Sequence, residues 1–405
     1  MLPNFRLPSV LLAHVRHTMA FYDPRCVDPS GGFYHFYKDD GTVYDRHTRH
    51  LVSSTRFIFN HAMAYRHFDQ PEYQQRVRHG IDFLRSAHRD PRTGGYAWEL
   101  CWNGQEKLIT DATNHCYGLA FVLLAYAHAC MAGVTEAHAY IAETFDLMER
   151  HFWDEQYGLY ADEASADWSV LGPYRGQNAN MHACEALLAA FDATGFKPYL
   201  LRAETLAYNI TVRQAALSGG LIWEHYRSDW SLDAGFNKDN RNDIFRPWGF
   251  QPGHLTEWSK LLLILERHQA HLAREPDWLL ARARDLFERA MAAAWDPVHG
   301  GIVYGFAPDG QVCDSDKYFW VQAETLAAAA LLAQRCDEPD YWHWYDRIWD
   351  YSWRHFVDHE NGAWYRILGG DNRKICTHKS PAGKTDYHTM GACYEVLGAL
   401  GPSHD

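Results

Sequence analysis

Apolar and polar positions along this chain form a pattern that returns at a near-constant interval. Each unit opens on a glycine, preceded in most copies by an Asp or Glu and followed by alternating aromatic or β-branched residues. This arrangement is typical of a turn that leads into a short strand. Successive spacings of 63, 63, 62, 81 and 61 residues predict a chain built from six repeats. The turn glycines are Gly32, Gly95, Gly158, Gly220, Gly301 and Gly362.

Two helical stretches are predicted between consecutive turns. The first of each pair is apolar on nearly all sides, as in residues 114–129, 181–193 and 319–333. Helices with that composition are buried all round. The second is amphipathic, as in residues 277–295, where apolar side chains share one face and charged side chains lie opposite. Each repeat is therefore predicted to supply one inner and one outer helix.

The helix predicted over residues 7–22 precedes the first turn, and it can pair with the last helix, over about 387–400. Six inner helices inside six outer ones form the (α/α)6 toroid, an all-α fold with short β-hairpins in its connecting loops. We therefore predict a single domain over residues 1–405, although length alone favours two or three domains. The N-terminal ends of the inner helices should open on one shared cavity and offer unpaired N–H groups to a ligand.

Polar side chains stand at the predicted starts of the inner helices, against the apolar trend. Any one of them is explained as an ordinary hydrogen-bonded buried residue. Six such placements at one end of a ring predict a shared site instead. In chain order the helices supply Arg56; Asn114, His115 and Tyr117; Asn178 and His182; His254 and Glu257; Trp320 and Glu324; and His388.

Composition and charge exclude several classes of partner. The chain is 47% hydrophobic and 22% charged, which is typical of a globular protein. Its net charge of −13 argues against nucleic acid and anionic membranes, because both bind a basic face. No apolar run reaches the roughly 20 residues that span a bilayer. The first 21 residues include Arg and His and lack a small-residue cleavage site, so no signal peptide is expected.

Cysteine and aromatic usage add two further expectations. Nine cysteines are spread singly, without a C-x-x-C, which indicates reduced thiols and a cytoplasmic location. The 16 Trp, 24 Tyr, 20 Phe and 25 His suit a sugar site, where aromatic rings cover C–H faces and imidazoles move protons. Most of the aromatic residues are nevertheless expected to fill the core.

The pair His254 and Glu257 has three interpretations: a metal site, an acid–base catalyst or a structural pair. A metal is not expected, because no H-E-x-x-H occurs and Glu-x-x-His pairs need further carboxylates or a third His. No nucleotide cofactor is expected either. The segment "SPAGKTD" (380–386) ends like a phosphate loop, but His378 stands where that motif needs its first glycine.

Acid–base chemistry remains the best interpretation of these residues. Imidazole takes up and returns a proton near neutral pH. A Glu one helical turn away, as Glu257 is from His254, can orient the ring and favour its charged form. His254 and His388, from different helices, could flank a substrate carbon. Arg56 could stabilise negative charge as it develops next to a carbonyl.

The order Arg, Asn-x-x-x-His, His-x-x-Glu, Trp-x-x-x-Glu, His along the six repeats resembles the N-acylglucosamine 2-epimerase superfamily, and within it the bacterial mannose isomerases. The most specific segments are "RPWGFQPGHLTEWSKLLL", "GQNANMHACEALLAA" and "WVQAETLAA". The resemblance implies no cofactor and a catalytic set of His254, His388, Glu257 and Arg56. It implies sugar binding by Asn178, His182, Trp320, Glu324, Tyr117 and Arg246.

The reaction that this resemblance implies is the interconversion of D-mannose and D-fructose. After ring opening, assisted by His182 or His254, one His carries a proton between C2 and C1 through a cis-enediol, and His388 is preferred for that step. The alternative is a sugar 2-epimerase of the mannose/glucose, N-acylglucosamine or cellobiose type. In that enzyme the two His would work on opposite faces of C2. The residues alone do not separate these outcomes.

Two long connections are predicted to shape the cavity, at residues 227–245 and 367–386. Connections of such length are usually functional lids or flexible segments, and we expect these two to limit the substrate to a monosaccharide. No cluster of Lys and Arg is evident near the site, so an unphosphorylated sugar is expected. A homodimer is a possible assembly.

Two rival functions fit the same fold, because a fold alone decides no function. An inverting glycosidase would use two carboxylates among Asp111, Glu257 and Glu324, and would leave the His pair without a task. A non-catalytic binding protein would not need that pair either.

Overall fold

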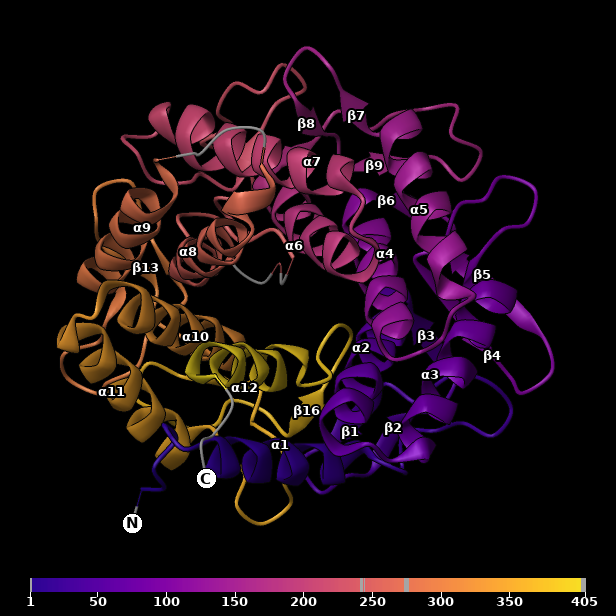
Figure 1. Cartoon of the computed structure of the whole chain (residues 1–405), viewed down its shortest axis with the longest axis horizontal. Coiled ribbons are helices and arrows are strands. Elements are labelled where there is room, and N and C mark those ends of the chain that lie inside the picture. Colours follow the sequence, from indigo (N-terminus) through magenta and orange to yellow (C-terminus); the bar gives the residue numbers. More distant parts are fainter. Residues whose placement is uncertain (1, 241–242, 244, 273–276, 402–405) are drawn as a thin grey trace.

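The structure, a computed structural model, describes residues 2–240, 243, 245–272 and 277–401. Within this part of the chain, twelve α-helices form two concentric rings around a central axis (Figure 1). The inner helices are α2 (Leu51–Phe68), α4 (Cys116–Met131), α6 (Gln177–Thr194), α8 (Pro252–Arg267), α10 (Phe319–Cys336) and α12 (Tyr387–Leu400). The outer helices are α1 (Pro8–Tyr22), α3 (Pro71–Phe83), α5 (Ala137–His151), α7 (Lys197–Tyr208), α9 (Leu279–Ala294) and α11 (Pro339–His355).

Each inner helix packs against the next around the ring, and α12 returns to pack against α2. The first outer helix, α1, packs on α12 and so joins the two ends of the ring (Figure 1). The predicted (α/α)6 toroid is thereby confirmed. The closed ring supports our proposal that the chain folds as one domain.

Burial follows the two predicted helix types. In α10 every residue from Val321 to Ala333 is buried, as expected for a helix surrounded by others. In α9 burial is confined to one stripe that includes Leu279, Leu286 and Ala290, while Glu288 on the other face stays exposed. Among the described residues, no helix combines the length and the apolar composition needed to cross a membrane.

The repeated glycine turns have a common local structure. In the turn after Trp295, the Asp296 carboxylate accepts backbone N–H bonds from Val298 and His299, and a bridge pairs Trp295 with Ile302. Gly301 has a φ of +79°, and a Cβ there would lie 2.4 Å from the Tyr351 ring. Carboxylates in the equivalent position of other turns bind backbone N–H groups in the same way; they belong to Asp28, Asp90, Asp154 and Asp358.

Short antiparallel strands occupy the connections, as predicted. Two sheets have three strands, in the orders β16-β1-β2 and β3-β4-β5; the pairs are β6-β9, β7-β8, β10-β11, β12-β13 and β14-β15. The strands are β1 (Phe36–Lys38), β2 (Val43–Asp45), β3 (Thr48–His50), β4 (Glu99–Trp102), β5 (Lys107–Asp111), β6 (Asn114–His115), β7 (Trp153–Asp154), β8 (Leu159–Tyr160), β9 (Glu163–Ala164), β10 (Arg175–Gly176), β11 (His225–Tyr226), β12 (Gly305–Phe306), β13 (Val312–Asp314), β14 (Lys317–Tyr318), β15 (Ile367–Leu368) and β16 (His378–Ser380).

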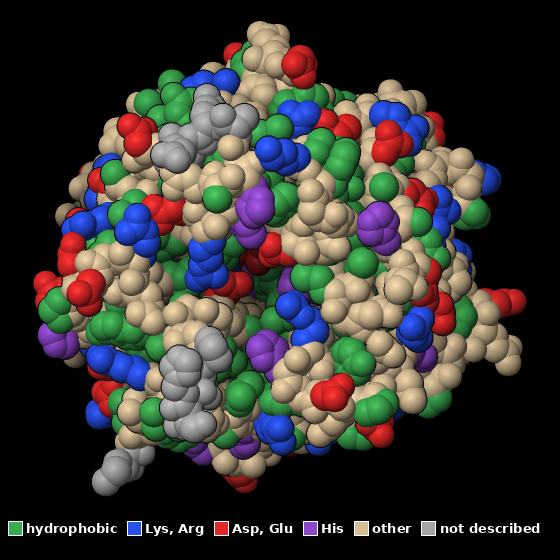
Figure 2. Space-filling view, in the orientation of Figure 1, with side chains coloured by type: hydrophobic (Ala, Val, Ile, Leu, Met, Phe, Trp, Pro, Cys, Tyr) green, Lys and Arg blue, Asp and Glu red, His purple; other side chains and the backbone are tan. Residues whose placement is uncertain are grey.

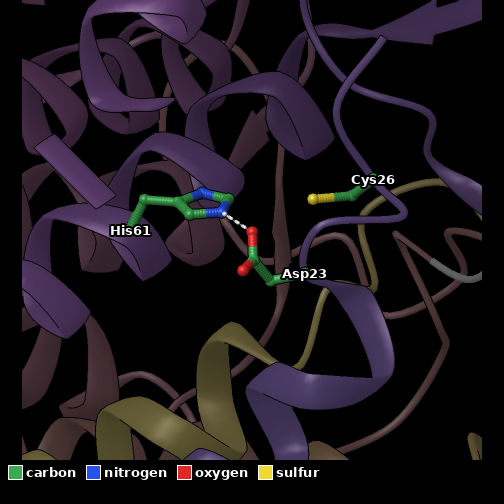
Figure 3. A group of neighbouring side chains, drawn as sticks. All are labelled: Asp23, Cys26 and His61. Carbon is green, nitrogen blue, oxygen red and sulfur yellow. Dashed lines mark ion pairs between the residues drawn. The ribbon is translucent and has the colours of Figure 1, made fainter. Parts of the chain in front are cut away.

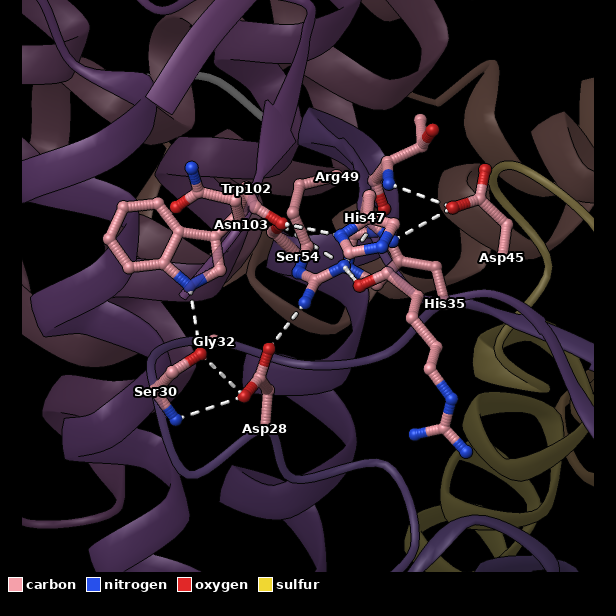
Figure 4. Close-up of polar contacts among 12 residues, drawn as sticks. Asp28, Ser30, Gly32, His35, Asp45, His47, Arg49, Ser54, Trp102 and Asn103 are labelled. Atoms are coloured by element: carbon pink, nitrogen blue, oxygen red, sulfur yellow. Dashed lines mark hydrogen bonds and ion pairs between the residues drawn. The ribbon is translucent and has the colours of Figure 1, made fainter. Parts of the chain in front are cut away.

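Polar contacts, one of them buried, tie the first glycine turn to the sheet β3-β4-β5 (Figure 4). The Arg49 guanidinium is fully buried and lies 2.5 Å from the Asp28 carboxylate. The Trp102 indole N–H donates to the Ser30 hydroxyl at 3.0 Å. These contacts fix the polypeptide that leads directly into α2.

Two predicted helix starts are displaced. The helix predicted from residue 114 begins at Cys116, because Asn114 and His115 pair with β9 instead. His115 therefore packs on Trp98, with ring centroids 4.1 Å apart, outside the inner helix. The helix predicted from residue 181 begins earlier, at Gln177.

Candidate active site

A cavity lies at the N-terminal ends of the inner helices, where the sequence predicted it. Side chains from all six inner helices border it, because each helix presents its first turns to the ring axis. Helix N-termini also direct partial positive charge and unpaired N–H groups toward this space. The predicted residues that line the cavity are Arg56, Tyr117, Asn178, His182, His254, Glu257, Trp320 and His388.

Both long connections contribute to the wall of the cavity. Phe245 ends the first, with Pro247 just beyond it, and Pro381 and Lys384 come from the second. Residues 241, 242 and 244 of the first predicted lid lie outside the described residues.

His254 is oriented by a carboxylate that the sequence did not single out. Its Nδ1 lies 2.9 Å from Oε2 of Glu224, in the connection just before β11. A carboxylate only accepts hydrogen bonds, so Nδ1 carries the proton and Nε2 is left free as a base. Glu224 is itself held by the Gln177 amide at 2.9 Å. The predicted pairing of His254 with Glu257 is therefore wrong, since the ring turns toward the loop.

His388 forms a second Glu–His pair in the same cavity. Its Nδ1 lies 2.6 Å from Oε1 of Glu324, one of the predicted residues, which stands behind the ring. The other carboxylate oxygen of Glu324 lies 2.5 Å from Nζ of Lys260. Burial lowers the pKa of His388 well below its usual value, with Arg56 and His182 adding to the effect, so the imidazole is neutral at neutral pH. A neutral imidazole with Nε2 unprotonated can accept a proton.

Glu257 is a carboxyl group of a different kind. It is fully buried, and neither of its oxygens has a hydrogen-bond partner among the described residues. Burial raises its pKa well above the usual value, and the neighbouring Glu324 charge raises it further. Glu257 is thus a neutral acid at the cavity wall, able to donate a proton or a hydrogen bond.

His182 occupies the wall between the two Glu–His pairs. Its Nδ1 lies 2.9 Å from Oε2 of Glu185, and Tyr387 donates its hydroxyl to the other oxygen of that carboxylate. Burial lowers the pKa of His182, so the neutral ring donates Nδ1–H to an ionised Glu185. The Tyr117 ring packs edge-on against His182 at 5.1 Å between centroids.

The Arg56 guanidinium is held rigidly beside these groups. It donates to the Gly383 carbonyl at 2.5 Å and to the Tyr117 hydroxyl at 3.2 Å. It also lies over the rings of Phe121 and Tyr387, 4.3 and 4.9 Å from their centroids. A fixed positive charge of this kind can stabilise an anion without reorganisation.

Trp320 forms an apolar wall that reaches the imidazoles of His254 and His388. Its ring centroid lies 5.0 Å from that of His254 and 5.8 Å from that of His388. Gly253 permits this approach, because a Cβ there would lie 2.5 Å from the indole. Across the cavity, the Asn178 carbonyl oxygen has no hydrogen-bond partner among the described residues and is available to a ligand.

Arg246 does not line this cavity. The structure places it in an adjoining pocket, with its guanidinium paired to Glu163 and stacked over Tyr174 at 4.0 Å. That pocket shares Tyr117 and Asn178 with the main cavity. Its neighbours Phe245 and Pro247 line the main cavity, whereas the contacts of Arg246 with Glu163 and Tyr174 hold its side chain in the adjoining pocket.

The expectation that no group of Lys and Arg accompanies the site is wrong. Arg366 and Lys384 line the cavity together with Arg56, although they come from distant segments. Two of the three are already engaged within the protein, since Lys384 lies 2.5 Å from Asp386 and Arg56 holds Gly383. The described residues therefore leave Arg366 as the main free cation at the wall.

Three clusters within the described residues have ligand-type atoms within 4.8 Å of one another. Two of them belong to the cavity: His182 with Glu185 and Glu257, and Glu257 with Glu324 and His388. The third, Asp23, Cys26 and His61, lies away from it between α1 and α2 (Figure 3). There Asp23 pairs with His61 at 3.5 Å and with Arg76 at 2.8 Å, so the protein already provides partners for this carboxylate. Burial raises the pKa of the Cys26 thiol, which keeps it protonated.

Sequence reasoning missed three charged residues of the site: Glu224, Lys260 and Glu185. Lys260 and Glu185 are charged residues within largely apolar inner helices. Because a buried charge needs an oppositely charged or hydrogen-bonding partner, this pattern could have indicated that both belong to a polar site. Glu224 follows a glycine turn in "SGGLIWEHY", and nothing in this local sequence distinguishes it from a surface carboxylate. Only the fold brings it to His254.

The chain is similar to proteins of known activity along nearly all its length. Residues 31–392 match the profile of the N-acylglucosamine 2-epimerase (GlcNAc 2-epimerase) family. A D-mannose isomerase of Marinomonas mediterranea is 55% identical over 400 residues, which cover 98% of this chain and 99% of that protein. A cellobiose 2-epimerase of Eubacterium cellulosolvens is 25% identical over 398 residues, covering 94% of this chain and 95% of that protein.

Solved structures agree with the sequence matches. The crystal structure of a D-mannose isomerase superposes with a TM-score of 0.94 at 54% identity, covering 98% of this chain and 100% of that one.

Proposed function

Because the chain belongs to the N-acylglucosamine 2-epimerase family, we propose that it is an aldose–ketose isomerase that interconverts D-mannose and D-fructose. The relative that is 55% identical over nearly the whole chain is named for that activity. The observation that carries the proposal is the presence of three imidazoles in one cavity, those of His182, His254 and His388, each with a carboxylate at Nδ1. Such groups transfer protons next to a carbonyl.

In the proposed mechanism the first step opens the pyranose ring. A base takes the proton from the O1 hydroxyl, and an acid returns one to the ring oxygen as the C1–O5 bond breaks. His254 or His182 accepts the first proton. The neutral carboxyl of Glu257, buried beside His182 at 4.0 Å, suits the second role because it holds its proton at neutral pH.

The second step moves hydrogen between C2 and C1. Nε2 of His388 takes the C2 proton, and the electrons form the enediolate of C1 and C2. The proton of the O2 hydroxyl passes to O1, and the same imidazolium gives its proton to C1, so that C2–O2 becomes the carbonyl of the ketose. Glu324 stabilises the transient imidazolium through Nδ1, and Arg56 offers its charge to the enediolate oxygen.

The sugar lies against an aromatic wall with polar groups around it. Trp320 suits the C–H face of the sugar, while Tyr117 and Asn178 suit its hydroxyls. We retain Arg246 as a weaker candidate that acts through the adjoining pocket. Arg56 and Lys384 are already paired within the protein, which favours an unphosphorylated sugar. A comparison of the rates with mannose and with mannose 6-phosphate tests this.

The reaction is tested by incubation with D-mannose in D2O followed by NMR. Fructose is expected as the main product. Glucose as the main early product would establish the alternative, 2-epimerisation, in which the enediolate is reprotonated at C2 from the other face. Release of reducing sugar from a mannoside without isomerisation would favour the glycosidase instead.

Three further proposals concern the working state of the enzyme. We propose that turnover needs no metal, because Lys260 already supplies positive charge between Glu257 and Glu324. Activity should therefore be unchanged in the presence of EDTA. We propose a cytoplasmic location, consistent with nine free cysteines. A homodimer is a possible assembly that light scattering tests.

A further inference from the structure

A layer of buried charge separates the catalytic cavity from a second cavity. The second cavity, of about 690 Å³, lies at the opposite ends of the inner helices, where Figure 2 shows a hollow with charged and His side chains around it. His388 borders both cavities, while Lys260, Glu324 and Glu185 border the second one. The layer is therefore reached by small molecules without passing the sugar.

Lys260 is the cation in contact with the carboxylates of this layer. Its Nζ lies 2.5 Å from Oε2 of Glu324 and 3.9 Å from Oε1 of Glu257. The Lys260 side chain is 7% exposed and that of Glu324 is 2% exposed, so solvent screens their attraction little. Burial alone would lower the pKa of Lys260, but Glu324, Glu257 and Glu185 raise it above its usual value, and it stays charged.

One cation thus faces two carboxyl groups that differ in protonation. We propose that Lys260 is a positioning residue that keeps Glu324 ionised and thereby holds His388 with Nδ1 protonated and Nε2 free toward the sugar. The inference rests on the proposed function, in which His388 moves the C2 proton. Lys260 does not line the cavity of the sugar, and it is linked to His388 through the carboxylate of Glu324.

The consequence of losing the cation follows from hydrogen-bond chemistry. Burial raises the pKa of Glu324, and Lys260 opposes that rise. Without Lys260 the carboxyl takes a proton and becomes a donor. It then donates to Nδ1 of His388, which forces the proton onto Nε2, and an Nε2–H cannot accept a proton from C2.

The other groups around Glu324 cannot replace Lys260. The charged or titratable neighbours on the packed helices are Arg56 from α2, His182 and Glu185 from α6, Glu257 from α8, and Tyr387 and His388 from α12. Arg56, the remaining cation of this set, is bound to Gly383 and Tyr117.

The first test is kinetic. In Lys260→Met, kcat for mannose should fall roughly 10- to 100-fold, because only the minority of molecules with a free Nε2 on His388 can take the C2 proton, and KM should stay within about threefold. Lys260→Arg should retain most of the activity, because it keeps the charge. Lys317→Met is the matched control, since Lys317 is also fully buried and ion-paired, at 2.9 Å from Asp296, but lies outside the cavity. A kcat in Lys260→Met within twofold of wild type would overturn the proposal.

The pH profile separates this role from a structural one. In Lys260→Met, kcat should rise with pH, because Glu324 regains its charge above its raised pKa and the Nε2 site reopens. Wild type should show no such rise over the same interval. A variant that is uniformly slow at every pH would contradict the proposal.

Chemical rescue uses the second cavity. Propylamine has the atoms that Lys260→Ala removes beyond Cβ, and it is charged at neutral pH. It should restore at least tenfold activity to that variant, whereas propan-1-ol of the same size should not. Equal rescue by both molecules would show that the charge of Lys260 is not needed and that only its volume matters. That result would overturn the proposal even if Lys260→Met fails to fold.

A spectroscopic measurement is independent of turnover. ¹⁵N NMR of labelled His should show the Nδ1–H form of His388 in wild type and the Nε2–H form in Lys260→Met, with the signal assigned from His388→Gln. Identical tautomers in both proteins would overturn the inference. If wild type converts no sugar, the proposed function fails, and this measurement still decides the role of Lys260.

Discussion

Replacement of Glu224 by Gln tests whether His254 depends on the carboxylate that orients it. The substitution keeps the size of the side chain and the partner Gln177, but it removes the charge 2.9 Å from Nδ1 of His254. A hydrogen bond to a charged group contributes about 1.5–3 kcal/mol, and this one is strongest when the imidazole is protonated. At about 1.4 kcal/mol per decade, kcat should fall roughly 10- to 140-fold.

The assay is the initial rate of fructose formation from mannose at saturation, with unfolding followed by circular dichroism. KM should change little, because Glu224 lies behind His254 rather than in the cavity wall. Glu149→Gln is the matched control: it also removes a paired carboxylate, bound to Arg202, but far from the cavity. If Glu224→Gln keeps kcat within threefold of wild type while folded, His254 does not act through this carboxylate.

Three further outcomes are expected. His254→Ala and His388→Ala should each abolish isomerisation while circular dichroism stays that of the native protein; activity like wild type in either removes that residue from its role. Cellobiose should be converted with kcat/KM at least 100-fold below that of mannose, because Phe245 and Pro381 narrow the cavity. Efficient conversion of the disaccharide would refute the hypothesis that the two long connections limit the substrate to a monosaccharide. The free energy of unfolding should fall between pH 6.5 and about 4, by about 1.4 kcal/mol per group and pH unit, because five buried or half-buried imidazoles take up protons only on unfolding. The melting temperature should fall with it, and a flat profile would contradict this. Burial lowers the pKa of these imidazoles to about 3 or 4, and they are His14, His50, His88, His115 and His128.

The fold was predictable because its information is local and repeated. A helix buried on all sides is apolar all round, as α10 is, and a turn closed by Asp296 and Gly301 needs those residue types. Six copies of one signal make the architecture clear. The resulting ring also predicted that polar residues at helix starts share a cavity, as His254 and His388 do.

The partners within the site were not predictable, because they depend on contacts between distant segments. Spacing on one helix suggested that Glu257 supports His254, but the ring turns to Glu224, 30 residues earlier. The cationic groups were missed for the same reason: Arg366 and Lys384 reach the cavity only through the path of the last long connection.

The contact of α1 with α12 affects how the protein forms during synthesis. The apolar stripe of α1, with Leu11, Val15 and Met19, is covered by helices that include the last in the ring. At about 5–20 residues per second, roughly 20 to 75 s pass between the translation of these two helices. The nascent chain therefore exposes this stripe for most of its time on the ribosome, and chaperones that bind apolar segments have their longest opportunity at α1.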